Sequence, residues 1–353
     1  MDFTRTLILK PSSMGDIVQA MPVLTALREG RPEARVWWMA AKPFTGLLED
    51  HPRLEGVIPF DRKRYGQAWW NPAAMRDLLG FLRDLRRHEF TLVLDLQGLL
   101  RTGLFARLSG ARDRVGFAAA RELAPLFYTE RVAVPAPDMH SVDRYLLVAR
   151  AVGLAAPKAT DHLPVTPAAR ARARDMLAEA GLGRDEPFVV VGADARWATK
   201  LWPAERYARV IDRVRAETGG RAVLVGGPDG RAVAGRIGEA AAEAPLDLVG
   251  RTTLKELVGL IAEARAMVTN DSGPMHVAAA VGTPTVAIFG PTNPDRTGPY
   301  GPGHRVMTAD VPCRPCYKRQ CVLGGTEALA CMTGVTADEV AEAVVETWRK
   351  RAP

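Results

Sequence analysis

The chain has 353 residues, of which 47% are hydrophobic and 25% are charged. This is the composition of an ordinary globular protein, and it argues against a disordered, collagen-like or coiled-coil chain. The length exceeds one typical core and predicts two domains of about 150 to 200 residues each. Because no apolar run reaches membrane-spanning length and no signal-peptide pattern precedes the first strand-like residues, we expect a cytoplasmic protein.

The chain is basic, with a net charge of +7 and a pI near 9.4. Such a charge favours an anionic partner, and nucleic acid and acidic membrane lipid both qualify. Many arginines lie beside acidic residues on predicted helix faces, where exposure to solvent is the simpler explanation. Denser clusters at residues 62–64 and at Arg83, Arg86 and Arg87 suit a phosphorylated or membrane-bound acceptor.

Short β-branched runs alternate with amphipathic stretches of helical length along the whole chain, which is typical of parallel sheets covered on both faces. In the first half we predict strands at 5–10, 34–40, 57–60, 91–96 and 113–117, and helices near 16–29, 72–87 and 140–153. In the second half we predict strands at 188–191, 222–225, 246–249, 266–269 and 285–289, and helices near 167–181, 203–217, 230–243 and 253–265. A final helix over 336–350 begins with a capping box of Thr336 and Glu339.

A proline-containing linker around 155–166 separates the two series. The predicted fold class is therefore α/β, with two Rossmann-like domains at 1–165 and 166–353. We expect the domains to face one another across a cleft and to bind ligand at the carboxyl ends of their strands.

Residues 270–276, Asn-Asp-Ser-Gly-Pro-Met-His, stand between a predicted strand and a helix of small residues. The first amides of a helix lack intrahelical partners and carry the positive end of its dipole, so Ser272 and Gly273 are placed to donate to phosphate oxygens. Asp271 and His276 then stay free for hydroxyl groups. An ordinary cap before a core helix explains the same residues, since Asp and Ser are preferred caps.

The first predicted strand ends in a polar loop, Lys-Pro-Ser-Ser-Met-Gly-Asp at residues 10–16. It lacks the spacing of a P-loop, so nucleoside triphosphate hydrolysis has no support. Gly15 permits a tight turn, and Asp16 lies at a helix start, where we expect it to face the cleft. A carboxylate there is suited to act as a general base on an acceptor hydroxyl. The structural alternative is a charge that caps the helix dipole.

Two loops in the second half place charged residues after strands. Lys200 lies just before Pro203, which suits the first turn of a helix. Its ammonium is placed to neutralise a leaving diphosphate, and an exposed loop lysine is the alternative. In the loop at residues 226–229, Asp229 is suited to accept from ribose hydroxyls or, equally, to form an Asx turn.

Several of these segments together resemble one family. The loop at 10–16, the segment Trp-Ala-Thr-Lys-Leu-Trp-Pro at 197–203 and the stretch at 270–292 are similar to the family 9 glycosyltransferases, the lipopolysaccharide heptosyltransferases. The resemblance spans nearly the whole chain. It is strongest to the heptosyltransferase I branch at 95–99, 114–117, 121–122, 127–128 and 140–144.

The resemblance implies a GT-B fold and the inverting transfer of heptose from ADP-L-glycero-D-manno-heptose to Kdo on lipid A, without a cofactor. It implies that Asp16 is the base and that Lys200 binds phosphate. We assign the donor site to Asp271, Ser272, Gly273, His276, Asp229 and Thr199. We assign the acceptor site to Ser12, Ser13, Gly15, Arg62, Arg64, Gln97, Arg121 and His140.

Inversion requires a single in-line displacement, with a base on the acceptor side and charge stabilisation on the leaving side. The sequence contains no Asp-x-Asp pair that would hold a divalent ion on the diphosphate. We therefore predict a metal-independent reaction in which Lys200 and the helix-start amides stabilise the leaving charge.

The four cysteines lie close together in the sequence, at Cys313, Cys316, Cys321 and Cys331. In a cytoplasmic chain such a group suggests a structural zinc or another metal. The last pair is Cys-x9-Cys rather than Cys-x2-Cys, which favours reduced or partly oxidised thiols over a metal site.

The expected partners are ADP-heptose, a Kdo-lipid A type acceptor and the cytoplasmic face of the inner membrane, where the chain acts as a peripheral monomer. The nearest alternative is a family 9 transferase that adds a later core heptose or another sugar. A nucleic-acid-binding protein with a metal at the cysteine cluster would carry a basic stripe with stacking aromatics, which the sequence lacks. A nucleotide-sugar-binding protein without turnover would have no need of Asp16.

Overall fold

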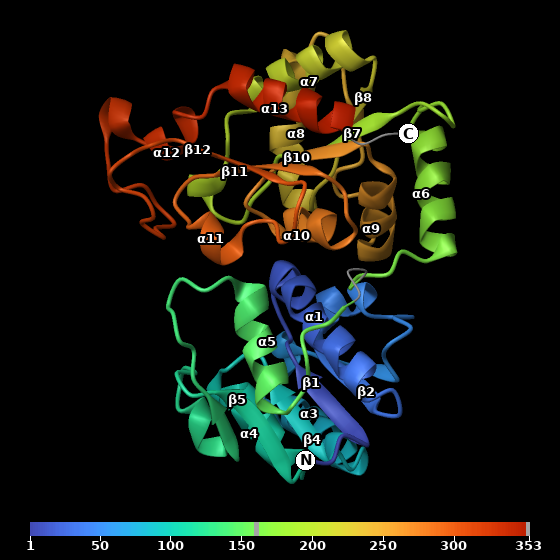
Figure 1. The fold of residues 1–353 in the computed structure, drawn as a ribbon, viewed down its shortest axis with the longest axis vertical. Coiled ribbons are helices and arrows are strands. Elements are labelled where there is room, and N and C mark those ends of the chain that lie inside the picture. The colour runs from blue at the N-terminus through green and yellow to red at the C-terminus, as the bar shows by residue number, and fades with distance from the viewer. Residues whose placement is uncertain (159–161, 351–353) are drawn as a thin grey trace. The chain divides into compact units, whose positions relative to one another are not determined.

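The computed structural model describes residues 1–158 and 162–350. The chain divides into two compact units, Met1–His162 and Leu163–Pro353, which are called unit 1 and unit 2 below (Figure 1). The predicted linker around 155–166 includes residues 159–161, which lie outside the described part of the chain.

Unit 1 contains a parallel six-stranded sheet in the order β3-β2-β1-β4-β5-β6. Its strands are β1 Arg5–Leu9, β2 Arg35–Ala41, β3 Gly56–Phe60, β4 Leu92–Asp95, β5 Asp113–Phe117 and β6 Glu130–Val132. Its helices are α1 Met14–Gly30, α2 Arg62–Tyr65, α3 Pro72–Arg87, α4 Leu100–Leu108 and α5 Ser141–Ala151, with the 3-10 turns η1 Lys42–Leu47 and η2 Ala124–Phe127.

Helices α3 and α4 cover the same face of this sheet. Phe81 of α3 and Phe105 of α4 belong to one buried cluster with Leu7 and Leu9 of β1. Residues two apart on a strand point to the same face, so the two leucines identify the covered side. Helices α1 and α5 pack against each other. Because α3 and α4 cover the same face of the sheet, their outer sides point away from the sheet in the same general direction.

Unit 2 contains a second parallel six-stranded sheet, in the order β12-β11-β10-β7-β8-β9. Its strands are β7 Phe188–Gly192, β8 Arg221–Leu224, β9 Leu246–Asp247, β10 Ala266–Asn270, β11 Thr285–Phe289 and β12 Arg305–Thr308. Its helices are α6 Pro167–Glu179, α7 Ala204–Thr218, α8 Arg231–Ala240, α9 Leu254–Glu263, α10 Gly273–Ala280, α11 Pro294–Thr297, α12 Ala330–Thr333 and α13 Ala337–Lys350, with the 3-10 turns η3 Ala198–Lys200, η4 Pro228–Gly230 and η5 Gly325–Glu327.

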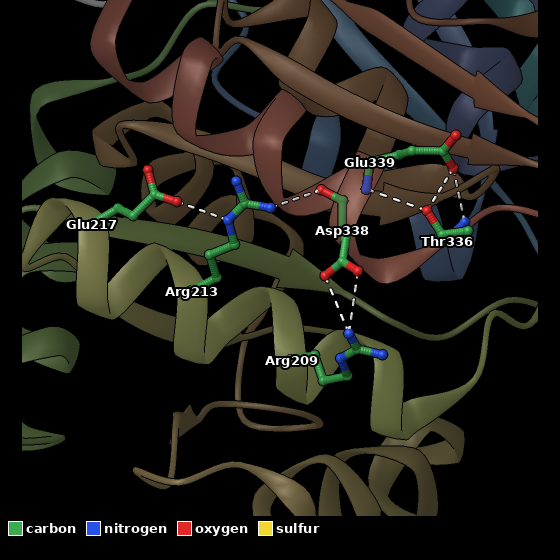
Figure 2. Close-up of polar contacts among 6 residues, drawn as sticks. All are labelled: Arg209, Arg213, Glu217, Thr336, Asp338 and Glu339. Atoms are coloured by element: carbon green, nitrogen blue, oxygen red, sulfur yellow. Dashed lines mark hydrogen bonds and ion pairs between the residues drawn. The ribbon is translucent and has the colours of Figure 1, made fainter.

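The last helix, α13, begins at the predicted capping box. Thr336 donates from its backbone amide (3.1 Å) and from its hydroxyl (2.6 Å) to Glu339 Oε2, and Glu339 N donates back to Thr336 Oγ1 at 3.3 Å (Figure 2). The first turn of α13 also meets α7, since Arg209 pairs with the Asp338 carboxylate at 3.1 Å. These contacts involve the arginine-rich face of α7, on which Arg209 is exposed and Arg206, Arg213 and Arg215 are partly buried.

The sequence prediction missed helix α4, strands β6 and β12 and the four-residue helices α2, α11 and α12, and it extended strand β9 too far. Helix α4 contains Gly103 and strand β6 has three residues, so neither gives a clear periodic signal. Strand β12 is an edge strand with mostly exposed side chains. Strand β9 ends at Asp247 rather than at 249, just before a turn in which Gly250 has φ +70°. Among the helices that the structure describes, none is both long and apolar enough to cross a membrane.

Candidate active site

Asp16 lies in the first turn of α1 and closes a capping box with Ser13. The backbone amide and the hydroxyl of Ser13 both donate to Asp16 Oδ2, at 2.9 and 2.7 Å. The capping role that sequence analysis offered as an alternative is therefore present. It does not bury the carboxylate, because 41% of the Asp16 side chain remains exposed.

Two buried residues that sequence analysis did not assign hold the other carboxylate oxygen of Asp16. The Lys10 ammonium lies 3.6 Å from Asp16 Oδ1, and the Tyr145 hydroxyl donates to the same oxygen at 3.2 Å. Burial by itself lowers the pKa of Lys10, but Tyr145, Asp16 and Asp95 together raise it above its usual value. The lysine is thus held as a cation beside the Asp16 carboxylate.

The turn after β4 brings together two predicted acceptor residues, Gln97 and Arg121. Asp95 is fully buried and accepts from the amides of Gln97 and Gly98 at 2.9 and 3.0 Å. Gly98 has φ +67°, and its carbonyl accepts from the Arg121 amide at 2.9 Å. The buried oxygen Oε1 of Gln97 has no hydrogen-bond partner among the described residues.

Asp95 is itself held by Tyr128, whose hydroxyl donates to Asp95 Oδ2 at 2.7 Å. Burial raises the pKa of Asp95, although these hydrogen bonds oppose the shift. The buried Asp95 carboxyl fixes the turn through its bonds to the amides of Gln97 and Gly98, and its burial keeps it from contacting ligands.

The remaining predicted acceptor residues are dispersed within unit 1. Ser12 lies in the β1–α1 loop and Gly15 lies in the first turn of α1 beside Asp16, while His140 caps α5 by accepting from the Val142 amide at 3.2 Å. Arg62 and Arg64 lie on α2, where Arg64 forms an ion pair with Asp77 of α3 at 2.7 Å. Arg64 therefore links α2 to the next helix, α3.

In unit 2, Lys200 and Asp271 form a closely packed ion pair. Lys200 Nζ lies 2.5 Å from Asp271 Oδ2, and the Thr292 hydroxyl donates to the same oxygen at 2.6 Å. Asp271 is only 6% exposed. The expectation that the Asp271 carboxylate stays free is therefore wrong, because its position at the end of β10 places it against the lysine that follows β7. The Lys200 ammonium also lies over the Trp197 ring, 4.8 Å from its centroid.

Asn270 joins the two loops that carry this pair. Its Nδ2 donates to the Ala193 carbonyl at 2.7 Å, and its Oδ1 accepts from the Trp202 amide at 3.3 Å and from the Tyr207 hydroxyl at 2.9 Å. Asn270 is fully buried, so each of these bonds replaces one to water. Sequence analysis gave Asn270 no role, since its partners are 63 to 77 residues away in the chain.

Helix α10 starts directly after the ion pair. Ser272 is its N-cap residue, and the Ser272 side chain makes no capping hydrogen bond to the helix. Its hydroxyl lies 3.3 Å from Thr269 Oγ1 instead. The amide of Gly273 in the first turn therefore keeps the donor capacity expected of an anion-binding helix start, whereas Pro274 has no amide hydrogen. His276 is buried in this turn. Thr199, on η3, donates its hydroxyl to the Lys318 carbonyl at 2.8 Å.

The glycine loop after β8 is built on Asp194. The Gly227 amide donates to Asp194 Oδ2 at 3.1 Å, and a Cβ at Gly226 would lie 2.9 Å from Asp194 Cγ. Burial raises the pKa of Asp194. The absence of side chains at these two glycines allows the loop to rest on the carboxyl group, and it leaves Asp229 exposed.

The four cysteines are all free thiols in the structure. Cys331 is buried near Gly290, and Cys321 accepts a hydrogen bond from the Leu329 amide at 3.4 Å. Hydrogen bonds from the amides of Leu329 and Leu323 lower the pKa of Cys321. Within residues 1–158 and 162–350, no three His, Cys, Asp or Glu side chains are grouped so that they could hold a metal ion. The preference for reduced or partly oxidised thiols over a structural metal at this cluster stays a prediction.

The model of glycosyltransferase family 9 (heptosyltransferase) matches residues 78–327. Lipopolysaccharide heptosyltransferase 1 of Pseudomonas aeruginosa is 32% identical over 92% of this chain and 89% of its own length.

Two solved structures of an Escherichia coli heptosyltransferase, WaaC, are also similar. The structure with ADP has a TM-score of 0.76 and 27% identity, covering 97% of this chain and 99% of that one. The structure with ADP-2-deoxy-2-fluoro heptose has a TM-score of 0.74 at the same identity and coverage. The predicted fold class, two Rossmann-like α/β domains of the GT-B type, is confirmed.

Proposed function

The chain belongs to glycosyltransferase family 9, the heptosyltransferases, and from this we propose that it transfers heptose from ADP-L-glycero-D-manno-heptose to the Kdo-lipid A inner core of lipopolysaccharide. The observation that carries the proposal is the joint position of Lys200 and the start of α10, which follow neighbouring strands of one sheet. Ligands of open α/β sheets bind at this carboxyl edge. The complexes of the E. coli relative with ADP and with an ADP-heptose analogue support a nucleotide-linked donor.

We assign the donor to unit 2. The Lys200 ammonium and the amides of Ser272 and Gly273 bind the diphosphate and stabilise its charge as it leaves. Asp271 orients Lys200 in the absence of ligand and contacts the sugar, with His276 and Thr199 beside them. Asp229, exposed on the loop that Asp194 supports, accepts from the ribose hydroxyls.

We assign Asp16 as the general base. Its carboxylate is half-exposed and is fixed by Ser13, Lys10 and Tyr145, so that it is both accessible and oriented. In the reaction, the acceptor hydroxyl loses its proton to Asp16 while its oxygen bonds to the anomeric carbon, and the bond to the diphosphate breaks with inversion. The charge of the leaving diphosphate is neutralised by protein groups, so the proposed mechanism uses no metal ion.

We assign the acceptor to unit 1, with Ser12, Ser13, Gly15, Gln97, Arg121 and His140 near the sugar and Arg62 and Arg64 toward anionic groups. The unpartnered Oε1 of Gln97 is an acceptor for a sugar hydroxyl. We further propose that the protein works as a monomer at the cytoplasmic face of the inner membrane. Family membership favours a heptosyltransferase over a nucleic-acid-binding protein and over a nucleotide-sugar-binding protein without turnover.

The direct test is an assay of the purified protein with a panel of nucleotide sugars and Kdo-lipid A as the acceptor. We expect transfer from ADP-heptose and loss of transfer in Asp16→Asn, with ADP affinity nearly unchanged in calorimetry. Asp338→Asn is the matched control, since it removes an exposed carboxylate that pairs only at the surface of α7. Transfer that survives in Asp16→Asn would remove Asp16 as the base, and transfer from another nucleotide sugar alone would replace the donor assignment.

A further inference from the structure

We propose that the outer side of α3, α4 and η2 in unit 1 is a docking surface for an anionic lipid bilayer. This surface, called the α3–α4 face below, consists of Trp69, Trp70, Met75, Leu79, Leu100, Leu104, Leu123 and Leu126 with Arg76, Arg83 and Arg86. The inference rests on the proposed function, in which the acceptor is lipid-anchored, and it names the part of the chain that meets the lipid.

Exposed hydrophobic side chains are concentrated on this face. Of the 13 large hydrophobic side chains that are exposed among the described residues, eight lie between residues 69 and 126. Trp69 is 82% exposed and Trp70 is 56% exposed, with their ring centroids 4.5 Å apart. Proteins in solution rarely leave so many neighbouring apolar groups in water unless the surface binds something.

The residues of the α3–α4 face share one side of the unit. The tryptophans directly precede α3, where Met75 and Leu79 lie one turn apart, and Leu100 and Leu104 are related in the same way on α4. Helix α3 contacts α4, and α4 contacts η2, which carries Leu126. Since α3 and α4 cover the same face of the sheet and contact each other, their exposed sides lie next to each other.

Positive charge accompanies the apolar groups. Residues 62–127 contain 12 Lys and Arg against 6 Asp and Glu, a net charge of +6 in a chain whose total is +7. The two acidic residues of α3 are already paired, Asp77 with Arg64 and Asp84 with Arg87. Arg83 follows Leu79 by one turn on the same side of α3, and Arg86 follows Arg83, so these two guanidinium groups flank the apolar stripe.

This combination fits a bilayer surface better than other anionic partners. Tryptophan prefers the headgroup region, leucine and methionine insert below it, and arginine attracts anionic headgroups. A single-stranded nucleic acid would require aromatic rings for stacking, whereas six of the eight apolar residues here are aliphatic. A second copy of the chain would place Arg76, Arg83 and Arg86 against the same three arginines, which disfavours association through this face.

The test is sedimentation of the full chain with vesicles of phosphatidylglycerol and phosphatidylethanolamine, compared with vesicles of phosphatidylcholine. We expect binding to the anionic vesicles that weakens with salt. Trp69→Ser with Trp70→Ser should reduce the partition coefficient at least about tenfold. Arg83→Glu with Arg86→Glu should reduce it at least about 25-fold, from roughly fivefold for each arginine.

Matched controls come from unit 2. Arg184→Glu with Arg236→Glu makes the same change in net charge at exposed positions, and Val322→Ser removes an apolar group that is 73% exposed. Neither control should change vesicle binding. Equal binding to both vesicle types, equal loss in the controls, concentration-dependent dimerisation through the tryptophans in light scattering, or binding of an oligonucleotide without binding of vesicles would each overturn the proposal.

Failure of this inference can be told apart from failure of the proposed function. The α3–α4 variants should transfer heptose normally to a de-acylated, water-soluble acceptor, and they should lose rate only with Kdo-lipid A held in anionic vesicles. If heptose transfer is absent in the wild type while vesicle binding follows the predicted pattern, the docking surface stands and the proposed function fails. If transfer is present and the variants bind vesicles like the wild type, the docking surface fails alone.

Discussion

The ion pair of Lys200 and Asp271 permits a quantitative test of how the donor site is held. Lys200→Met would leave the Asp271 carboxylate, which is 6% exposed, without its cation. Removing one partner of a buried pair typically costs about 3–5 kcal/mol of unfolding free energy. Because the Thr292 hydrogen bond remains, we expect a value near the lower end, about 3 kcal/mol.

The double variant separates the pair from its parts. Asp271→Asn alone should cost less, about 1–2 kcal/mol, because the lysine can turn toward solvent. Lys200→Met with Asp271→Asn should cost less than the sum of the single changes by about 1.5–3 kcal/mol. Urea unfolding followed by tryptophan fluorescence measures all four proteins. A coupling free energy within about 0.5 kcal/mol of zero would refute the reasoning.

An exposed pair in the same unit supplies the control cycle. Arg209 and Asp338 are 3.1 Å apart, with side chains that are 65% and 73% exposed. Their coupling should be below about 1 kcal/mol, since solvent screens surface pairs. Calorimetry with ADP adds the functional readout. Lys200→Met should weaken ADP binding, whereas Asp271→Asn should retain it, because the lysine is then released to the diphosphate. Equal effects of the two variants on ADP would show that Lys200 acts only through stability.

Three further predictions follow from single contacts. Burial raises the pKa of Asp194 in the folded state above its unfolded value, which is near 3.9. At a pH between these two pKa values, the folded state holds a proton that the unfolded state has lost. Wild-type stability relative to Asp194→Asn should therefore fall as pH rises through that interval in urea titrations, and a rise would contradict the sign. Tyr145→Phe removes a hydrogen bond that orients Asp16, so kcat/KM should fall while ADP affinity in calorimetry stays unchanged, and an unchanged kcat/KM would argue against Asp16 as the base. Thr336→Ala should lower the free energy of unfolding by about 1 kcal/mol without changing heptose transfer. An unchanged midpoint of urea unfolding would show that the capping box does not stabilise the protein.

The central strands of both sheets were predictable because strands buried on both faces of a parallel sheet are mostly apolar. Every residue of β7 and β10 is buried, and each run stands out in the sequence against the polar loop that follows it. The polar residues at the ends of these strands were predictable for the same reason, since the carboxyl ends of parallel strands meet at one edge. Strand β12 was missed because an exposed four-residue edge strand carries no such contrast.

Side-chain partners were not predictable from the local pattern. Tyr145 reaches Asp16 across 129 residues of sequence, and no spacing rule connects the two. Asn270 was noticed as part of a motif, yet its role is to bond Ala193 and Trp202 on another loop. Local sequence places a group at a strand end, whereas the register between strands determines what lies opposite it.

Both proposed reacting centres consist of a charge that already has an internal counter-charge. Asp16 is paired with Lys10, and Lys200 is paired with Asp271. A reactive ion without such a partner would cost several kcal/mol when it is partly buried, and it would be neutralised by a shift of its pKa. The two pairs differ in exposure, because the Asp16 side chain is 41% exposed whereas that of Lys200 is 16% exposed. Asp16 can therefore accept a proton from a substrate without losing Lys10, but Lys200 can bind a diphosphate only by sharing or releasing Asp271. Donor binding should thus rearrange the Lys200 pair, while the geometry around Asp16 stays fixed.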